Sequence, residues 1–94
     1  MKVLISPGFG AGFSTWNNSE MAVDKDLIAL FEKGCTEEEM ETLCLEKGYD
    51  SYMGGFDQLE VIEVPQGCHF QIREYDGHES IQIFHANDWF YAED

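Results

Sequence analysis

The sequence predicts an α+β fold in a single domain, residues 1–94, with an antiparallel β-sheet and a two-helix hairpin packed on one of its faces. Three observations lead to this prediction. Short β-branched segments occur at the start and in the second half of the chain, and two segments with helical periodicity lie between them. The dipeptide Asp76–Gly77 joins the last two strands as a tight turn. The order of elements is therefore β-α-α-β-β-β.

The first strand is predicted over residues 2–6, "KVLIS", because it is apolar and β-branched and is stopped by Pro7. We expect it to join the same sheet as the later strands. A glycine-rich loop, "PGFGAGFSTWNNS", follows over residues 7–19 and places aromatic side chains between closely spaced glycines.

The first helix is predicted from Lys25 to Lys33. Asp24 is a suitable N-cap, and Gly34 stands where the helix should stop.

The second helix is predicted to start at Thr36, which forms a capping-box pattern with Glu39, and to end at Gly48. The two helices resemble a helix-turn-helix. The second one, however, opens with several glutamates where a recognition helix would meet phosphates, so the sequence argues against DNA reading.

Three strands are predicted after a second loop, over residues 59–64, 69–75 and 78–84. The two-residue turn fixes the register of the last two, and this register gathers apolar side chains on one face. The opposing residues on this face are Ile72 with Ile81 and Phe70 with Ile83.

The same register sets Glu74 opposite Glu79, a pair whose repulsion costs little if both side chains are exposed. Arg73 is expected to pair with Glu60 or Glu63 on the neighbouring strand. The aromatic tail, residues 87–94, is expected to form a short strand or an ordered extension.

The charge is the strongest compositional feature, since nineteen acidic residues face five basic ones and the net charge is −14. Such a field repels DNA, RNA and anionic membranes and attracts basic protein surfaces. The alternative is that the acidic surface serves solubility alone. No apolar run is long enough to cross a membrane, which predicts a soluble, cytoplasmic protein.

The reactive residue types show no pattern of a metal or cofactor site, so the sequence predicts neither. Three cysteines are an odd number without zinc-binding spacing, and they are expected to be free thiols. The three histidines are spread too widely along the predicted strands for one metal ion. No nucleophile pattern is present around Ser14, which predicts a protein without enzymatic activity.

The glycine loop has three interpretations. Its "GFGAG" spacing departs from the dinucleotide-binding pattern and lacks the lysine of a phosphate-binding loop, although its N–H groups could still hold a nucleotide. It could be a structural turn whose aromatic rings fill the core. It could also present these rings to a partner.

The partner-binding interpretation is the one we carry forward. "YMGGF" at residues 52–56 repeats the glycine–aromatic theme, so the two loops could lie side by side, with Asp50 and Asp57 as an acidic rim. Glutamates of the second helix would stand in for phosphates. The predicted partner-binding residues are Phe9, Phe13, Trp16, Tyr52, Phe56, Glu37, Glu38 and Glu41.

The segments "KVLISPGFGAGFSTWN" and "YMGGFDQLEVIEVP" resemble a family of small acidic proteins from phages and bacterial mobile elements. The likeness covers most of the chain but carries no assigned site residue. It implies an anti-defence context, in which such proteins block a host protein, as anti-CRISPR proteins and DNA mimics do.

The sequence therefore predicts an inhibitor that occupies a basic surface of a nucleic-acid-binding host protein, for example a CRISPR effector, in the bacterial cytoplasm. A small-ligand or nucleotide binder that acts as a sponge for a defence signal is the alternative. A housekeeping domain and a homo-oligomer also remain open.

Overall fold

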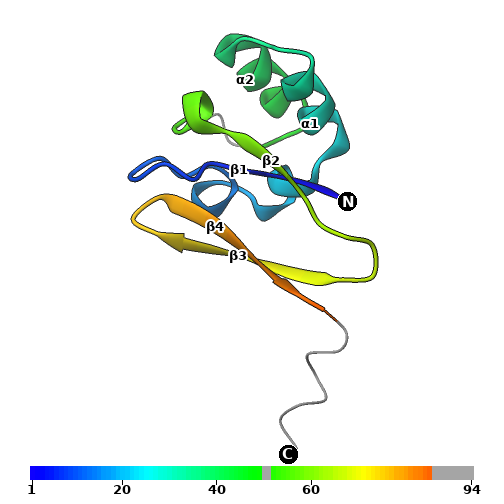
Figure 1. Cartoon of the computed structure of the whole chain (residues 1–94). Coiled ribbons are helices and arrows are strands. Elements are labelled where there is room, and N and C mark those ends of the chain that lie inside the picture. The colour runs from blue at the N-terminus through cyan, green and yellow to red at the C-terminus, as the bar shows by residue number, and fades with distance from the viewer. Residues whose placement is uncertain (50–51, 86–94) are drawn as a thin grey trace, which may run out of the picture.

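The computed structural model describes residues 1–49 and 52–85, and it confirms the α+β class (Figure 1). The regular elements occur in the predicted order. They are β1 (Lys2–Ile5), α1 (Lys25–Glu32), α2 (Glu37–Glu46), β2 (Glu60–Glu63), β3 (His69–Tyr75) and β4 (His78–Phe84), with 3-10 turns at Ser14–Trp16, Ser19–Val23 and Phe56–Gln58.

The strands form two antiparallel two-stranded sheets, β1–β2 and β3–β4, so the expectation that all strands join one sheet is wrong. The residues of β1 explain the difference. Val3 and Ile5 point to one side and Leu4 to the other, and all three are buried. A sheet covered on one face would expose one of these sets to water, whereas cover on both faces buries all of them.

The molecule is accordingly layered. The α1–α2 hairpin covers one face of β1–β2, and the β3–β4 hairpin packs against the other (Figure 1). On the helical side Leu4 packs with Leu27 and Met40, while on the hairpin side Val3 and Ile5 meet the partly buried isoleucines of β3 and β4.

Both predicted helix starts are confirmed. Asp24 caps α1 through Oδ1, which accepts from the N–H groups of Asp26 at 2.9 Å and Leu27 at 3.2 Å. The capping box of α2 is complete, because Thr36 Oγ1 accepts from Glu39 N and Glu39 Oε1 accepts from Thr36 N.

The hairpin register is also confirmed, with Ile72 opposite Ile81 and Phe70 opposite Ile83. Asp76 and Gly77 have φ values of 49° and 82°, as a two-residue turn with two left-handed residues requires.

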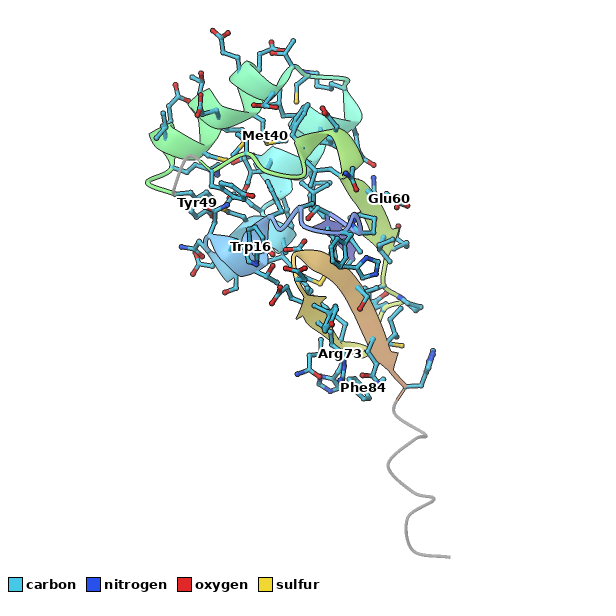
Figure 2. The ribbon with its side chains drawn as sticks, turned by 90° about the vertical axis from the view of Figure 1, so that its left-hand side faces the viewer. Trp16, Met40, Tyr49, Glu60, Arg73 and Phe84 are labelled. Atoms are coloured by element: carbon cyan, nitrogen blue, oxygen red, sulfur yellow. The ribbon has the colours of Figure 1, made fainter. Side chains whose placement is uncertain are left out.

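The expected pairing of Arg73 is wrong. Within residues 1–49 and 52–85 no ion pair joins it to Glu60 or Glu63, because β2 pairs with β1 and not with β3. Figure 2 shows Arg73 on the hairpin, well away from Glu60. Glu63 instead binds the ammonium group of Met1 at 3.0 Å. The predicted tail at 87–94 lies outside the described residues.

Candidate functional site

The glycine loop wraps around the turn of the β3–β4 hairpin. Gly10 N donates to the carbonyl of Asp76 and Gly12 N to that of Gly77, both at 2.7 Å. The approach is close enough that a Cβ on Gly77 would lie 2.6 Å from the backbone nitrogen of Ala11. Only glycine fits this crossing, which fastens the first loop to the last hairpin.

Backbone N–H groups of the glycine loop bind an anionic group of the chain itself, the carboxylate of Glu79 in β4. Glu79 is 0% exposed. Its oxygens accept from the backbone N–H groups of Ser6 at 2.9 Å, Phe13 at 2.9 Å and Thr15 at 3.1 Å, and from the hydroxyl of Thr15. A buried carboxylate is tolerated when its oxygens are satisfied in this way.

The predicted register set Glu79 opposite Glu74, a pair whose repulsion costs little if both side chains are exposed, but Glu79 is buried. Glu79 lies on the same face as Ile81, so it points inward with the apolar residues. Glu74, which faces it across the hairpin, is exposed, and its carboxylate accepts from Gly77 N at 2.6 Å and from the indole N–H of Trp16 at 3.3 Å.

Phe13 is the one predicted partner-binding residue that the structure removes from the surface. It is 0% exposed and belongs to the core beneath the helices. The reason is local, because Gly12 has a φ of 66° and turns the chain, while the Phe13 N–H is bound to Glu79. The side chain is thereby directed inward and cannot anchor a partner.

Three other predicted aromatic residues stay accessible. Phe9 is 72% exposed at the tip of the loop, and Trp16 and Tyr52 are 44% and 41% exposed. The rings of Trp16 and Tyr52 contact each other with centroids 5.8 Å apart. Phe56 is half-buried and packs edge-to-face on Phe31 of α1.

The two glycine–aromatic loops lie side by side, as predicted. The hydroxyl of Tyr52 donates to the carbonyl of Ala11 at 2.9 Å, and the amide of Asn17 donates to the carbonyl of Tyr52 at 3.0 Å. A Cβ on Gly55 would lie 2.8 Å from the Cβ of Ala11 and 2.9 Å from the carbonyl oxygen of Gly12, so the two loops are closely packed.

A hollow of about 520 Å³, which we call the acidic groove, lies between the second loop and the start of α2. It brings together four of the predicted residues: Glu37, Glu41, Tyr52 and Phe56. Asp57, expected on the rim, lines it as well, whereas Asp50 lies outside the described residues.

Glu38 lies elsewhere. It lines a separate hollow with Leu30 and Leu43, because residues 37 and 41 share a helix face that residue 38 does not.

The groove carries uncompensated negative charge. Its lining in the described part of the chain includes three carboxylates and no lysine or arginine. Met53, the backbone of Gly54 and Gly55, and the two aromatic rings make up much of the rest. An apolar wall beside unpaired carboxylates suits an elongated cationic side chain, whose stem packs on the rings while its charge meets the acids.

A cluster of polar side chains links the start of α1 to the end of α2, the helix whose first residues line the groove. Asp24 Oδ2 accepts from the hydroxyl of Tyr49 at 2.8 Å and lies 3.2 Å from Lys47 Nζ. Burial would raise the pKa of Asp24, but the hydrogen bonds from Tyr49, Leu27, Lys47 and Asp26 outweigh it and lower the pKa. The bond to Asp24 raises the pKa of Tyr49 to about 12.

One contact was missed in the sequence. Cys68 Sγ lies 3.3 Å from Nδ1 of His85, immediately beyond the paired residues His69 and Phe84. Extending the predicted register by one residue would have found it. In residues 1–49 and 52–85, no three histidine, cysteine or carboxylate side chains are grouped to hold a metal ion.

Comparison with protein-family models, curated proteins and solved structures yields no match for the chain. Over the described residues, none of the helices has the length and apolar character needed to span a bilayer. The candidate site therefore rests on the geometry of the acidic groove.

Proposed function

We propose that this chain is a non-enzymatic interaction protein that places its acidic groove and the neighbouring Trp16 against a basic surface of a nucleic-acid-binding protein. The observation that carries the proposal is the groove itself. Glu37, Glu41 and Asp57 line it together with Tyr52 and Phe56, with no basic side chain in its described lining.

The charge of the whole chain supports the same partner class. At −14, the protein steers cationic surfaces toward itself and repels nucleic acid and anionic lipid. Occupation of a basic nucleic-acid-binding surface would exclude the phosphates that normally bind there. This mode of action fits the anti-defence context implied by the sequence resemblance, with a CRISPR effector in the bacterial cytoplasm as one candidate partner.

The contact surface can combine charge with burial of rings. The ring of Trp16 contacts that of Tyr52 in a tilted arrangement, and Tyr52 lines the groove, so the accessible aromatic surface continues beyond the hollow. Aromatic residues at the centre of an interface with charges around them are typical of binding hot spots.

The alternative, a nucleotide held by the glycine loop, finds less support. The N–H groups of Gly10, Gly12, Phe13 and Thr15 already donate to groups within the chain. A phosphate would have to displace the carboxylate of Glu79 from its buried position.

The test is capture of partners from bacterial lysate by the tagged protein, followed by competition of each partner against its own nucleic acid. The double variant Glu37→Gln with Glu41→Gln should lose the partner. Glu46→Gln with Glu60→Gln removes the same charge from exposed sites outside the groove and should retain it.

Salt supplies the second criterion. Binding should weaken steeply between low salt and about 0.5 M salt, where exposed charges are screened within a few ångströms. Salt-independent binding, or equal loss in both double variants, would contradict the proposed function.

A further inference from the structure

A second hollow, of about 580 Å³, lies between α1 and the beginning of the chain, and lysines line it in place of unpaired carboxylates. We call it the lysine groove. Lys25, Ile28, Ala29 and Glu32 of α1 form one wall, since residues at these spacings share one helix face. Met1 and Lys2, the first residue of β1, form the other wall, and Val23 also lines the hollow.

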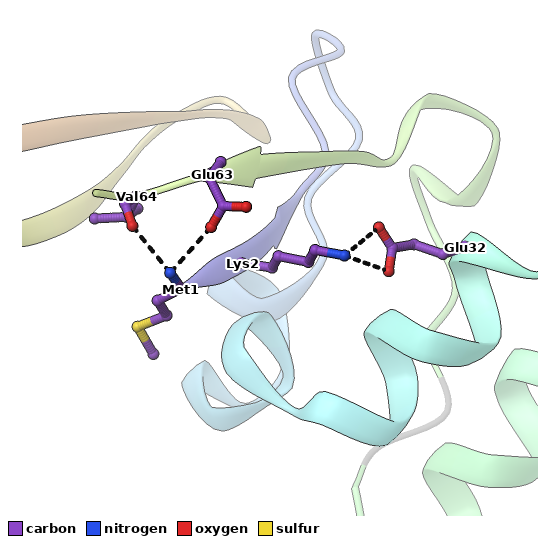
Figure 3. Close-up of polar contacts among 5 residues, drawn as sticks. All are labelled: Met1, Lys2, Glu32, Glu63 and Val64. Atoms are coloured by element: carbon purple, nitrogen blue, oxygen red, sulfur yellow. Dashed lines mark hydrogen bonds and ion pairs between the residues drawn. The ribbon is translucent and has the colours of Figure 1, made fainter. Parts of the chain in front are cut away.

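The basic groups here are unusual for so acidic a molecule. The chain has only five lysines and arginines, and two of them, Lys2 and Lys25, line this hollow. Lys2 Nζ is engaged by both oxygens of Glu32 at 2.9 Å, and this ion pair bridges β1 and α1 (Figure 3). Lys25 forms no ion pair among residues 1–49 and 52–85.

The two ends of the hollow therefore differ. At the end of Glu32 the lysine charge is neutralised, whereas at the start of α1 the ammonium of Lys25 is available. Ile28 and Ala29 lie between them on the helix, and Val23, just before α1, adds a third apolar side chain to the lining. Lys25 and Glu32 are two helical turns apart, about 10 Å along the axis. The hollow thus offers one cationic end and an apolar channel of limited length.

We infer that the lysine groove binds a single-chain amphiphilic carboxylate, of the fatty-acid type, with its head group at Lys25 and its alkyl chain along Ile28 and Ala29. Charge complementarity selects this class, because an anionic head meets one of the few available cations in a molecule that otherwise repels anions. The volume lies within the range of small-ligand pockets. This inference is independent of the acidic groove.

The test uses decanoate below its micelle concentration as the probe, with the protein tagged at its C-terminus. Titration followed by amide NMR should shift signals of Val23, Ile28 and Ala29. Decyltrimethylammonium, an amphiphile of similar length with a cationic head, should bind at least about fivefold more weakly when its affinity is read from these same signals, as loss of a charge-assisted contact implies.

Two variants at exposed positions locate the ligand. Lys25→Gln should weaken decanoate binding by at least about fivefold, and Ala29→Trp should fill the channel and abolish it. Lys33→Gln, with the same charge change outside the hollow, should leave it unchanged. Amide spectra of each variant without probe establish that it is folded.

Three outcomes would overturn the inference. These are equal binding of the two amphiphiles, equal effects of Lys25→Gln and Lys33→Gln, and shifts confined to other surfaces. Sedimentation tests a fourth outcome, namely that a second copy of the chain occupies the groove. In that case the protein self-associates, Ala29→Trp abolishes the self-association, and decanoate has no effect on it. Each affinity is read from signals of the lysine groove, and neither Lys25 nor Ala29 lines the acidic groove, so failure here is distinguishable from failure of the proposed function.

Discussion

The carboxylate of Glu79 accepts a hydrogen bond of 2.9 Å from the backbone N–H of Phe13, which lies 66 residues earlier in the chain. This contact joins the glycine loop at the start of the fold to the hairpin at its end. Together with the bonds from Ser6 and Thr15, it makes one buried acid the link between two layers. Several measurable consequences follow from it and from the contacts around it.

Replacement of Glu79 by glutamine should destabilise the fold by about 2–4 kcal/mol, because the amide NH₂ group would face a backbone donor and leave buried groups unpaired. Urea denaturation measures the change. Glu60→Gln, on an exposed position of β2, is the matched control and should stay within about 0.5 kcal/mol of the wild type. Equal stability of both variants would show that the loop does not depend on the buried carboxylate.

Gly77→Ala should destabilise more than Gly67→Ala. Both glycines have positive φ, 82° and 87°, so both substitutions carry a backbone penalty of about 1 kcal/mol. Only at Gly77 would the new Cβ also collide with backbone, at 2.6 Å from Ala11 N, while Gly67 has open space around it. The difference between the melting temperatures of the two variants measures the effect of the collision with the glycine loop. Equal melting temperatures would contradict the close approach of Gly77 to Ala11.

Phe13→Ala and Trp16→Ala should separate stability from binding. Phe13 is buried in the core, so its truncation should cost about 3–5 kcal/mol of unfolding free energy. Trp16 is partly exposed, so Trp16→Ala should lower the unfolding free energy far less. The loss of this ring should, however, weaken binding of the basic partner. The two effects are measured by urea denaturation and by partner binding at low salt. A Trp16 variant with full binding would remove this ring from the proposed interface.

The stability should fall in acid through Asp24. Its pKa in the folded chain is lowered, so its contribution is complete above the unfolded value of about 3.9 and is lost as the pH falls through the folded pKa. Asp24→Asn should flatten this dependence below about pH 4. Denaturation midpoints across that range check the expectation, with Asp57→Asn, an exposed acid, as the control.

Tyr49→Phe removes the hydroxyl that donates to Asp24 and should cost about 1.5–3 kcal/mol, as loss of a hydrogen bond to a charged group does. Because Tyr49 has its pKa raised to about 12, its contribution is present below pH 10 and is lost as the pH rises through the folded value. A spectrophotometric tyrosine titration gives the second readout. A normal pKa for Tyr49 would contradict the bond.

Local patterns in the sequence were sufficient for the elements themselves. The caps at Asp24 and Thr36 and the turn at Asp76–Gly77 act within a few residues, so their outcome could be predicted without the fold. The two glycine–aromatic loops were expected to lie side by side, and they do, whereas the gathering of Glu37 and Glu41 with Tyr52 and Phe56 in one groove was not predicted.

Tertiary structure decided the rest. Whether Phe13 faced a partner or the core, and whether Glu79 faced water or the loop, depended on contacts between residues more than 60 positions apart. The division into two sheets depended on β1 needing cover on both faces. The sequence determined the elements and their charge because helix caps and turns are local. Burial was settled only when distant segments packed together, because the free energy of removing a side chain from water depends on what covers it.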